Sequence, residues 1–331
     1  MTLYLLKRIL LMIPTLVGIT LVTFLMIRLA PGDPASLKAQ GSAESLASDR
    51  ASQEIVLETQ KLYGLDRPWL EQYGLWMKRL ATLDFGTSYR DHRSVLSKIA
   101  EALPVTLALN VITIFIIYLI SIPLGAYSAL KPQGFVDRAS TLVLFFLFSL
   151  PNFWVAMVLL LVFAGGDYLN WFPLVGIVSQ GAEALPWYEY LTNIAWHLVL
   201  PIVCLTYGGL AFLSRFTRGA MLEVIRQDYI RTARAKGLSE WKVVSRHALR
   251  NAAIPLLTLM STLLPSLLGG SVIIEKIFAI PGMGRLGFES VLARDYPVVM
   301  AIATISAVLT LLSILITDLL YAVVDPRVTF E

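Results

Sequence analysis

The sequence predicts an all-α polytopic membrane protein, and three observations support this fold class. First, 56% of the 331 residues are hydrophobic, only 15% are charged, and the mean hydropathy is +0.70. Second, the apolar residues form long blocks, and a helix needs about 20 such residues to cross a bilayer. Third, the basic residues gather between alternate blocks, as the positive-inside rule predicts. The net charge of +4 therefore reflects membrane topology and does not indicate a nucleic-acid-binding protein.

The first apolar block covers residues 9–29 and follows two basic residues. It is longer than the core of a usual signal peptide, and no small-residue cleavage pattern follows it. We therefore expect residues 1–30 to form a cytoplasmic tail and an uncleaved span. Residues 31–104, which begin with Pro31-Gly32-Asp33-Pro34, are expected to form a long external loop. This loop is predicted to contain a short helix at 53–63 and an amphipathic, aromatic-rich helix at 68–83.

Five further spans are predicted, which makes six in all, at residues 105–130, 140–164, 194–213, 253–274 and 297–321. Prolines lie inside several of them, and we expect interruptions at Pro123-x-Gly125 and at Pro151. The loop at 165–193 has acidic residues and no basic ones, which is typical of an external loop. The loop at 275–296 is expected to turn at Pro281-Gly282-Met283-Gly284.

The distribution of basic residues predicts which side each loop occupies. Residues 131–138 and 215–250 are rich in Lys and Arg and are expected in the cytoplasm, together with both termini. The core of the protein is predicted at 105–324, and residues 325–331 form a second cytoplasmic tail.

Residues 215–250 carry nine basic residues against three acidic ones. Helical spacing predicts that Leu222, Ile225, Tyr229 and Ala233 share one helix face. Gly237 is expected to end that helix in a left-handed turn, and Ser239 to cap the next. The second helix is predicted to carry an apolar stripe of Leu238, Trp241, Val244 and Ala248. We interpret this helix–turn–helix as a docking handle for a soluble partner that supplies energy.

The residue types of common catalytic and metal sites are scattered. His92, His197 and His247 fall in an external loop, a span and the cytoplasmic segment, so they cannot form one cluster. Cys204 is the only cysteine and is expected to be buried in a span. The HExxH, GxSxG and G-x-x-x-x-G-K-[ST] patterns are absent. We therefore expect no catalytic residue, metal site or cofactor in this chain.

Small polar residues concentrate in the predicted span at 253–274. Two interpretations remain open, since such residues allow close helix packing but can also line a path for a polar solute. The candidate path residues are Thr258, Ser261, Thr262, Ser266, Gly269 and Ser271. An ion-coupled transporter would be expected to place charged residues near the middle of its spans, and few are found here.

Several motifs together resemble those of ABC importer permeases, and more narrowly the B-type subunit of the dipeptide, oligopeptide and nickel branch. The segment from Asp228 to Gly237, followed by His247 to Ala252, is similar to the "EAA" loop of these proteins. Arg231 stands where the wider family has Glu, and Arg250 where it has Pro; both departures recur in the peptide-type branch. Further matches in the same order are Ile13-Pro14-Thr15, Pro31-Gly32-Asp33-Pro34, Asp84-Phe85-Gly86-Thr87-Ser88, Pro281-Gly282-Met283-Gly284-Arg285, Arg294-Asp295-Tyr296-Pro297-Val298-Val299 and Asp325-Pro326-Arg327.

The resemblance implies a type I ABC importer permease fold in the bacterial inner membrane, surrounded by lipid. It also implies a homologous C-type permease, two cytoplasmic ATPases that bind ATP and Mg²⁺, and an extracytoplasmic solute-binding protein as partners. Peptides would be moved by alternating access. Nickel or another small solute is the alternative cargo, and an ion-coupled transporter or channel is the alternative class. The residues implied to couple to an ATPase are Asp228, Tyr229, Ile230, Arg231, Thr232, Ala233, Arg234, Ala235, Lys236, Gly237 and Leu238.

Overall fold

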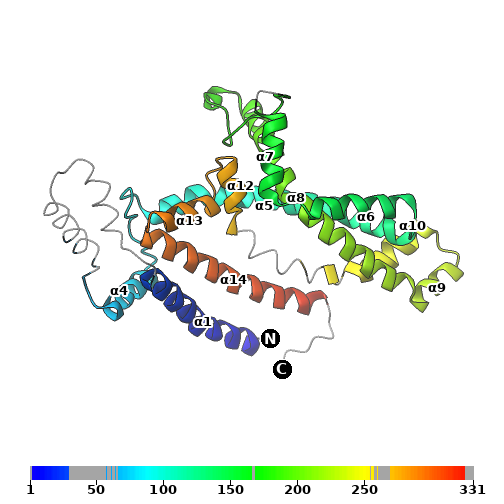
Figure 1. Cartoon of the computed structure of the whole chain (residues 1–331). Helices are drawn as coiled ribbons and strands as arrows, with labels where there is room; N and C mark the ends of the chain where they lie inside the picture. The colour runs from blue at the N-terminus through cyan, green and yellow to red at the C-terminus, as the bar shows by residue number, and fades with distance from the viewer. Residues whose placement is uncertain are drawn as a thin grey trace. The chain divides into compact units, whose positions relative to one another are not determined.

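The computed structural model describes residues 2–29, 57, 61, 64, 66–165, 168–253, 255–256, 259 and 269–324. Within these ranges the regular secondary structure is helical, and an isolated bridge joins Thr87 to Ser94. The chain divides into two compact units, and Figure 1 shows the helices of both. The first unit is built mainly from Met1–Leu103 and Leu286–Ile316, and the second mainly from Pro104–Arg285. The predicted all-α class is confirmed.

Among the described residues, four helices are long and apolar enough to cross a bilayer. They are α1 (Thr2–Leu29), α5 (Val95–Leu130), α8 (Trp187–Ile225) and α14 (Tyr296–Val324). A further candidate is the pair α6 (Phe135–Phe148) and α7 (Asn152–Phe163), bent by 96°. The predicted span at 253–274 lies largely outside the described residues, so the count of six spans stays a prediction.

The predicted interruption at Pro151 is confirmed. α6 ends at Phe148, and Pro151 occupies the position just before the first residue of α7. The Tyr207 hydroxyl on α8 lies 2.7 Å from the Leu150 carbonyl oxygen and 2.5 Å from Asn152 Oδ1. A neighbouring helix thus satisfies a carbonyl group at the break, which is how interrupted helices are tolerated in membranes.

The predicted interruption at Pro123-x-Gly125 is wrong. α5 starts at Val95 and runs unbroken through both Pro104 and Pro123. A Cβ atom added to Gly125 would lie 2.5 Å from the Ser214 carbonyl oxygen and 2.7 Å from Thr217 Cβ. The absence of a side chain at Gly125 therefore allows α8 to approach α5 closely. Small residues commonly allow such close contacts between membrane helices.

α8 is longer than the span predicted at 194–213. It continues through Pro201 to Ile225, and it packs against both α6 and α7. Its C-terminal extension therefore includes Arg215 and Arg218, which were expected to belong to a separate handle. The buried residues of α8 include Thr217 and Met221, and this packing explains why the helix persists beyond the apolar block.

The first unit contains α1, the amphipathic α4 (Trp69–Ala81) and the first part of α14. The helix predicted at 68–83 is thus confirmed. The Thr20 hydroxyl lies 3.0 Å from that of Tyr73, and the rings of Phe24 and Tyr73 are 5.5 Å apart, so α4 packs on α1. Of the helix predicted at 53–63, Leu57 and Lys61 are helical and most of the rest, like Pro31-Gly32-Asp33-Pro34, lies outside the described residues.

The segments that are predicted to form external loops contain more helix than the sequence predicts. Residues 275–296, expected to be a loop, contain the end of α12 (Val272–Ile277) and the whole of α13 (Met283–Leu292). Residues 165–193 include the short 3-10 helix η1 (Ala182–Ala184) and the start of α8. Side chains in both segments are buried, such as Glu275 and Ala182. The polarity of Glu275 and the loop position of Ala182 would alone predict exposure.

Candidate functional site

The segment 215–250 of the second unit, which is predicted to be cytoplasmic, contains a short helix, α9 (Asp228–Ala235), which begins three residues after α8 ends. The predicted face is wrong at Tyr229: Leu222, Ile225 and Ala233 contribute to one apolar cluster, but the chain leaves the helix at Arg226 and Gln227. Ile230 and Ala233 are the buried residues of α9, whereas Tyr229 is 44% exposed. Because of the bend between α8 and α9, the buried position in the first turn of α9 is Ile230 and not Tyr229.

The buried side of α9 belongs to an apolar cluster of the second unit. Ile230 and Ala233 share this cluster with Ala126 and Ala129 of α5 and with Met221 of α8. The cluster also includes Val243 and Ala248 from the segment that follows. Since Ile230 and Met221 have no solvent exposure, α9 is fixed to the ends of two membrane helices and should move with them.

The predicted turn at Gly237 is confirmed. Gly237 has a φ of +77°, its N–H donates to the Arg234 carbonyl at 2.9 Å, and the Leu238 N–H donates to the Ala233 carbonyl at 3.4 Å. This pair of bonds is the usual left-handed ending of a helix. A Cβ atom at Gly237 would meet nothing within 4 Å, so the backbone conformation is the reason for glycine here.

The second helix of the segment differs from the prediction. Ser239 stands at its N-cap but makes no side-chain capping bond, and α10 (Glu240–Lys242) passes into a π-helical stretch, η2 (Val243–Ala248). Val243 and Ala248 are buried, while Trp241 is 77% exposed, so the predicted stripe is wrong at Trp241. The wider π turn changes the register of the buried face, and such turns are frequent at functional sites.

The basic residues of 215–250 divide into two groups. Arg218 donates to Asp137 through Nε at 2.7 Å and through a terminal nitrogen at 2.8 Å, and Arg215 lies 3.5 Å from the same carboxylate. Asp137 is buried on α6, so these two arginines join α6 to α8. They do not belong to the surface of the handle, and the sequence offered no sign of this pairing.

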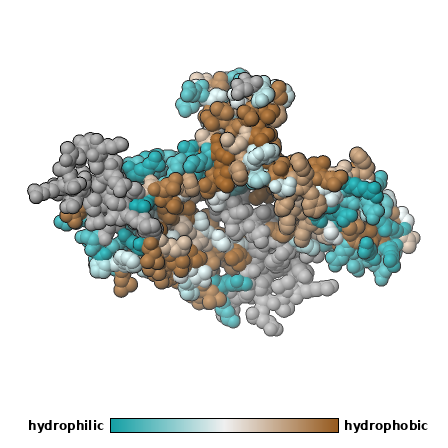
Figure 2. All heavy atoms as spheres, viewed as in Figure 1, coloured by the Kyte–Doolittle hydropathy of each residue, from teal (hydrophilic) through white to brown (hydrophobic). Residues whose placement is uncertain are grey.

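The other basic residues lie on the surface. Arg234 pairs with Glu240 and Arg231 with Asp228, both within the segment. In the described part of the chain, no carboxylate forms an ion pair with Arg226, Lys236, Lys242, Arg246 or Arg250. Figure 2 shows hydrophilic side chains over the α9–α10 end of the second unit. We call this surface the handle face; its apolar members are Tyr229, Leu238 and Trp241, and its basic members are Arg231, Arg234 and Lys236.

The predicted path residues cannot all be placed. Thr258, Ser261, Thr262 and Ser266 lie outside the described residues. Gly269 is exposed, and Ser271 stands at the N-cap of α12 and accepts the Glu275 N–H at 2.8 Å. Both interpretations of this span, packing and path lining, therefore stay predictions.

A buried carboxylate lies directly after this span, and sequence reasoning missed it. Glu275 is 1% exposed, accepts the Arg285 N–H at 2.8 Å and lies 3.1 Å from the Thr106 hydroxyl oxygen. The Thr106 oxygen in turn accepts the Met283 N–H at 2.8 Å. Burial raises the pKa of the Glu275 carboxyl, while the bond from the Arg285 N–H acts in the opposite direction. Glu275 thus fixes the first turn of α13 against α5 and α12.

Glycines make room for this carboxylate. A Cβ atom at Gly282 would lie 2.5 Å from Glu275 Cδ, and one at Gly270 would lie 2.5 Å from Glu275 Oε1. Gly282 has no positive φ, so the Pro281-Gly282-Met283-Gly284 motif requires glycine there for close approach to Glu275. The expected reason, a turn conformation, does not apply to Gly282.

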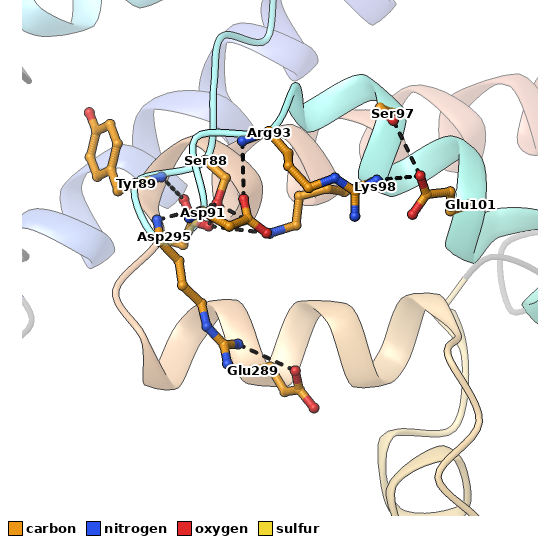
Figure 3. Close-up of polar contacts among 10 residues, drawn as sticks. Ser88, Tyr89, Asp91, Arg93, Ser97, Lys98, Glu101, Glu289 and Asp295 are labelled. Atoms are coloured by element: carbon orange, nitrogen blue, oxygen red, sulfur yellow. Dashed lines mark hydrogen bonds and ion pairs between the residues drawn. The ribbon is translucent and has the colours of Figure 1, made fainter. Parts of the chain in front are cut away.

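In the first unit, two distant motifs meet in a polar cluster (Figure 3). Asp295 is buried, accepts the Ser88 hydroxyl and accepts the Tyr89 N–H at 2.8 Å. Lys98 Nζ lies 2.7 Å from Asp91 Oδ2 and 3.9 Å from Asp295 Oδ2. Burial would raise the pKa of Asp91, but the bonds from Lys98 and Ser88 lower it to about 2. The cluster holds the loop before α5 on the start of α14.

The titratable side chains of the described residues do not form a metal centre. His197 is buried, with Nδ1 2.8 Å from the Asn193 carbonyl oxygen. No three His, Cys, Asp or Glu side chains in the described ranges are placed to share a metal ion. The cluster around Asp295 consists of ion pairs and hydrogen bonds, which favours a structural role for it.

The motifs that meet in these clusters belong to a known family. Residues 121–330 match the family described as binding-protein-dependent transport system inner membrane component, and residues 1–110 match the N-terminal region of such components. The chain belongs to this family. It is therefore a permease, a multi-pass inner-membrane component of a transport system, and permeases of this kind work in general with ATPase and solute-binding partners.

Relatives of the permease are similar over their whole length. The oligopeptide transport system permease protein AppB of Bacillus subtilis is 40% identical over 331 residues, covering 100% of both chains. The peptidoglycan transport system permease protein YejB of Agrobacterium fabrum is 35% identical, covering 99% of this chain and 98% of that protein. The dipeptide transport system permease protein DppB of Alkalihalophilus pseudofirmus is 36% identical, covering 99% of each.

A solved structure shares the fold of the permease. A chain of the MetNI methionine ABC transporter, in an inward-facing conformation, superposes with a TM-score of 0.52 at 20% identity. The match covers 70% of this chain and 97% of that one. The type I ABC importer permease fold expected from the sequence is thereby confirmed.

Proposed function

We propose that this permease moves di- and oligopeptides across the inner membrane as the B-type subunit of an ABC importer. Its full-length relatives AppB and DppB carry names that specify oligopeptide and dipeptide transport, which favours peptides over nickel as the cargo. It pairs with a homologous C-type permease and with two cytoplasmic ATPases, and an external binding protein delivers the peptide. ATP and Mg²⁺ bind to the ATPases, which hydrolyse the ATP, and this chain does not hydrolyse ATP itself.

The mechanism is supported above all by α9, which has one buried side and one exposed side. Its inner side, Ile230 and Ala233, packs with Met221 of α8 and with two alanines of α5. Its outer side is the handle face, which combines exposed aromatic rings with basic side chains. An ATPase surface that binds the handle face can pull α5 and α8 as rigid bodies when ATP closes the ATPase pair. The path then opens to alternate sides of the membrane.

Uptake measurements test the cargo and the energy source. Cells that depend on this transporter should accumulate a labelled dipeptide or tripeptide, and uptake should stop when ATP is depleted but survive dissipation of ion gradients. The purified complex should contain ATPase subunits. Uptake that tracks an ion gradient and survives ATP depletion would exclude the importer mechanism, and uptake of nickel without uptake of peptide would exclude the proposed cargo.

A glycine substitution tests the coupling. Gly237→Val should strain the left-handed turn and displace α9, so peptide uptake should fall about tenfold or more while the ATPases continue to hydrolyse ATP. Gly219→Ala is the matched control, because Gly219 lies within α8 and a Cβ atom there meets nothing within 4 Å. Wild-type uptake by Gly237→Val at equal expression would show that the turn does not couple hydrolysis to transport.

A further inference from the structure

A cavity of about 370 Å³ lies in the first unit, and none of its described lining residues belongs to the handle face. Its walls come from both membrane helices of that unit and from the external segment. The last two turns of α1 contribute Phe24 and Arg28, the first turn of α14 contributes Tyr296 and Met300, and α4 contributes Trp76. A cavity between the ends of two membrane spans lies at the depth where hydrocarbon gives way to lipid headgroups.

Four basic residues line this cavity: Arg28, Lys61, Arg67 and Arg79. No acidic side chain lines it among the described residues. Arg67 is paired with an acidic residue outside the lining, since its Nη1 lies 2.9 Å from Glu71 Oε1. Arg79 and Lys61 form no ion pair with any described residue. Among the described residues the lining is therefore positive, and Arg79 in particular has charge to offer to an anion.

Aromatic rings hold part of this charge in position. The Arg28 guanidinium lies 5.5 Å from the ring centre of Phe24 and 5.4 Å from that of Tyr296. Phe85, Gly86 and Thr87 form another part of the wall, and this loop is held by the Asp295 cluster described above. Figure 3 shows that cluster directly beside the loop. Most of the described wall thus comes from α1, α4, α14 and a loop held by hydrogen bonds, and Lys61 is the one lysine of the described lining.

We propose that this cavity binds the anionic headgroup of a phospholipid. The phosphate accepts charge-assisted hydrogen bonds from Arg79 and Arg28, while aromatic side chains such as Trp76 contact the glycerol region at the membrane boundary. The acyl chains lie along the apolar ends of α1 and α14. A bound lipid would add to the contacts that join α1, α4 and α14, such as those of Thr20 with Tyr73 and of Arg28 with Tyr296.

The test uses the complete transporter, purified in detergent and incubated with equal amounts of phosphatidylglycerol and phosphatidylcholine. Native mass spectrometry then counts the lipids retained. Wild-type protein should keep at least one phosphatidylglycerol in preference to phosphatidylcholine. Arg79→Gln should weaken that retention about tenfold, the loss expected for one charge-assisted hydrogen bond. Lys78→Gln is the control, because Lys78 is the preceding exposed residue of α4 and does not line the cavity.

Each other outcome overturns the proposal. Equal retention of the two lipids would show that the cavity does not select an anionic headgroup, and equal loss in both variants would show a general charge effect. Displacement of the lipid by millimolar inorganic phosphate would identify a site for free anions instead. Arg79 is exposed on α4, so the variant should fold, and an unchanged thermal denaturation profile confirms that retention alone has changed.

Discussion

At the residue scale, buried polar groups explain motifs whose purpose the sequence did not reveal. Asp295 accepts bonds from Ser88 and Tyr89, so two motifs separated by about 200 residues form one cluster. Glu275 likewise explains glycines at 270 and 282. Each carboxylate is buried and hydrogen-bonded, as buried charges must be to remain stable.

Gly282→Ala is expected to destabilise the second unit. The new methyl group would lie 2.5 Å from Glu275 Cδ, and Glu275 cannot withdraw because its carboxylate is held by Arg285 N–H and Thr106. Such overpacking costs about 1–3 kcal/mol. Thermal denaturation of the purified protein measures the loss, with Gly219→Ala as the control in open space. An unchanged midpoint in Gly282→Ala would show that the carboxylate is not fixed as described.

At the element scale, one buried carboxylate adds ion pairs to the packing of α6 against α8. Asp137 receives two bonds from Arg218, a longer contact from Arg215 and the Gln133 N–H at 2.9 Å. The two arginine side chains are only 25–30% exposed. These contacts of Asp137 with Arg215 and Arg218, which we call the clamp, are therefore largely shielded from water, in contrast to the exposed ion pairs on the handle face.

Asp137→Asn should lower the free energy of unfolding by about 3 kcal/mol, because it leaves two largely buried guanidinium groups without their counter-charge. Asp228→Asn is the matched control, since its pair with Arg231 is exposed and such pairs contribute little. Denaturant titration of the purified protein compares the two variants. Equal stability of both would mean that the clamp contributes no more than a surface ion pair.

At the scale of the whole molecule, the arrangement of loops on two sides of the membrane stays a prediction. Cys204 is buried in α8, so a membrane-impermeant thiol reagent should not label the wild-type protein. Leu70→Cys in α4 should be labelled from outside intact cells, because α4 belongs to the predicted external loop. Lys131→Cys should be labelled only after the cells are opened. Labelling of both from the same side would refute the six-span topology.

The sequence alone was sufficient for properties that depend on local pattern and composition. Long apolar blocks predict membrane helices wherever they occur, Pro151 predicts a break, and Gly237 predicts a left-handed turn. The amphipathic spacing at 68–83 predicts α4 for the same reason. These features follow from the hydrophobic effect and from backbone sterics, which act over a few neighbouring residues.

The tertiary structure decided which residues face the core, where helices end and which charges meet. Tyr229 and Ile230 are adjacent and both apolar enough to be buried, and only the bend after Ile225 places Ile230 inside. Arg218 belongs to the basic stretch by its position in the sequence. It is paired with Asp137, 81 residues away, and is therefore not part of the handle face. Such pairings depend on contacts between distant segments, and no local pattern in the chain encodes them.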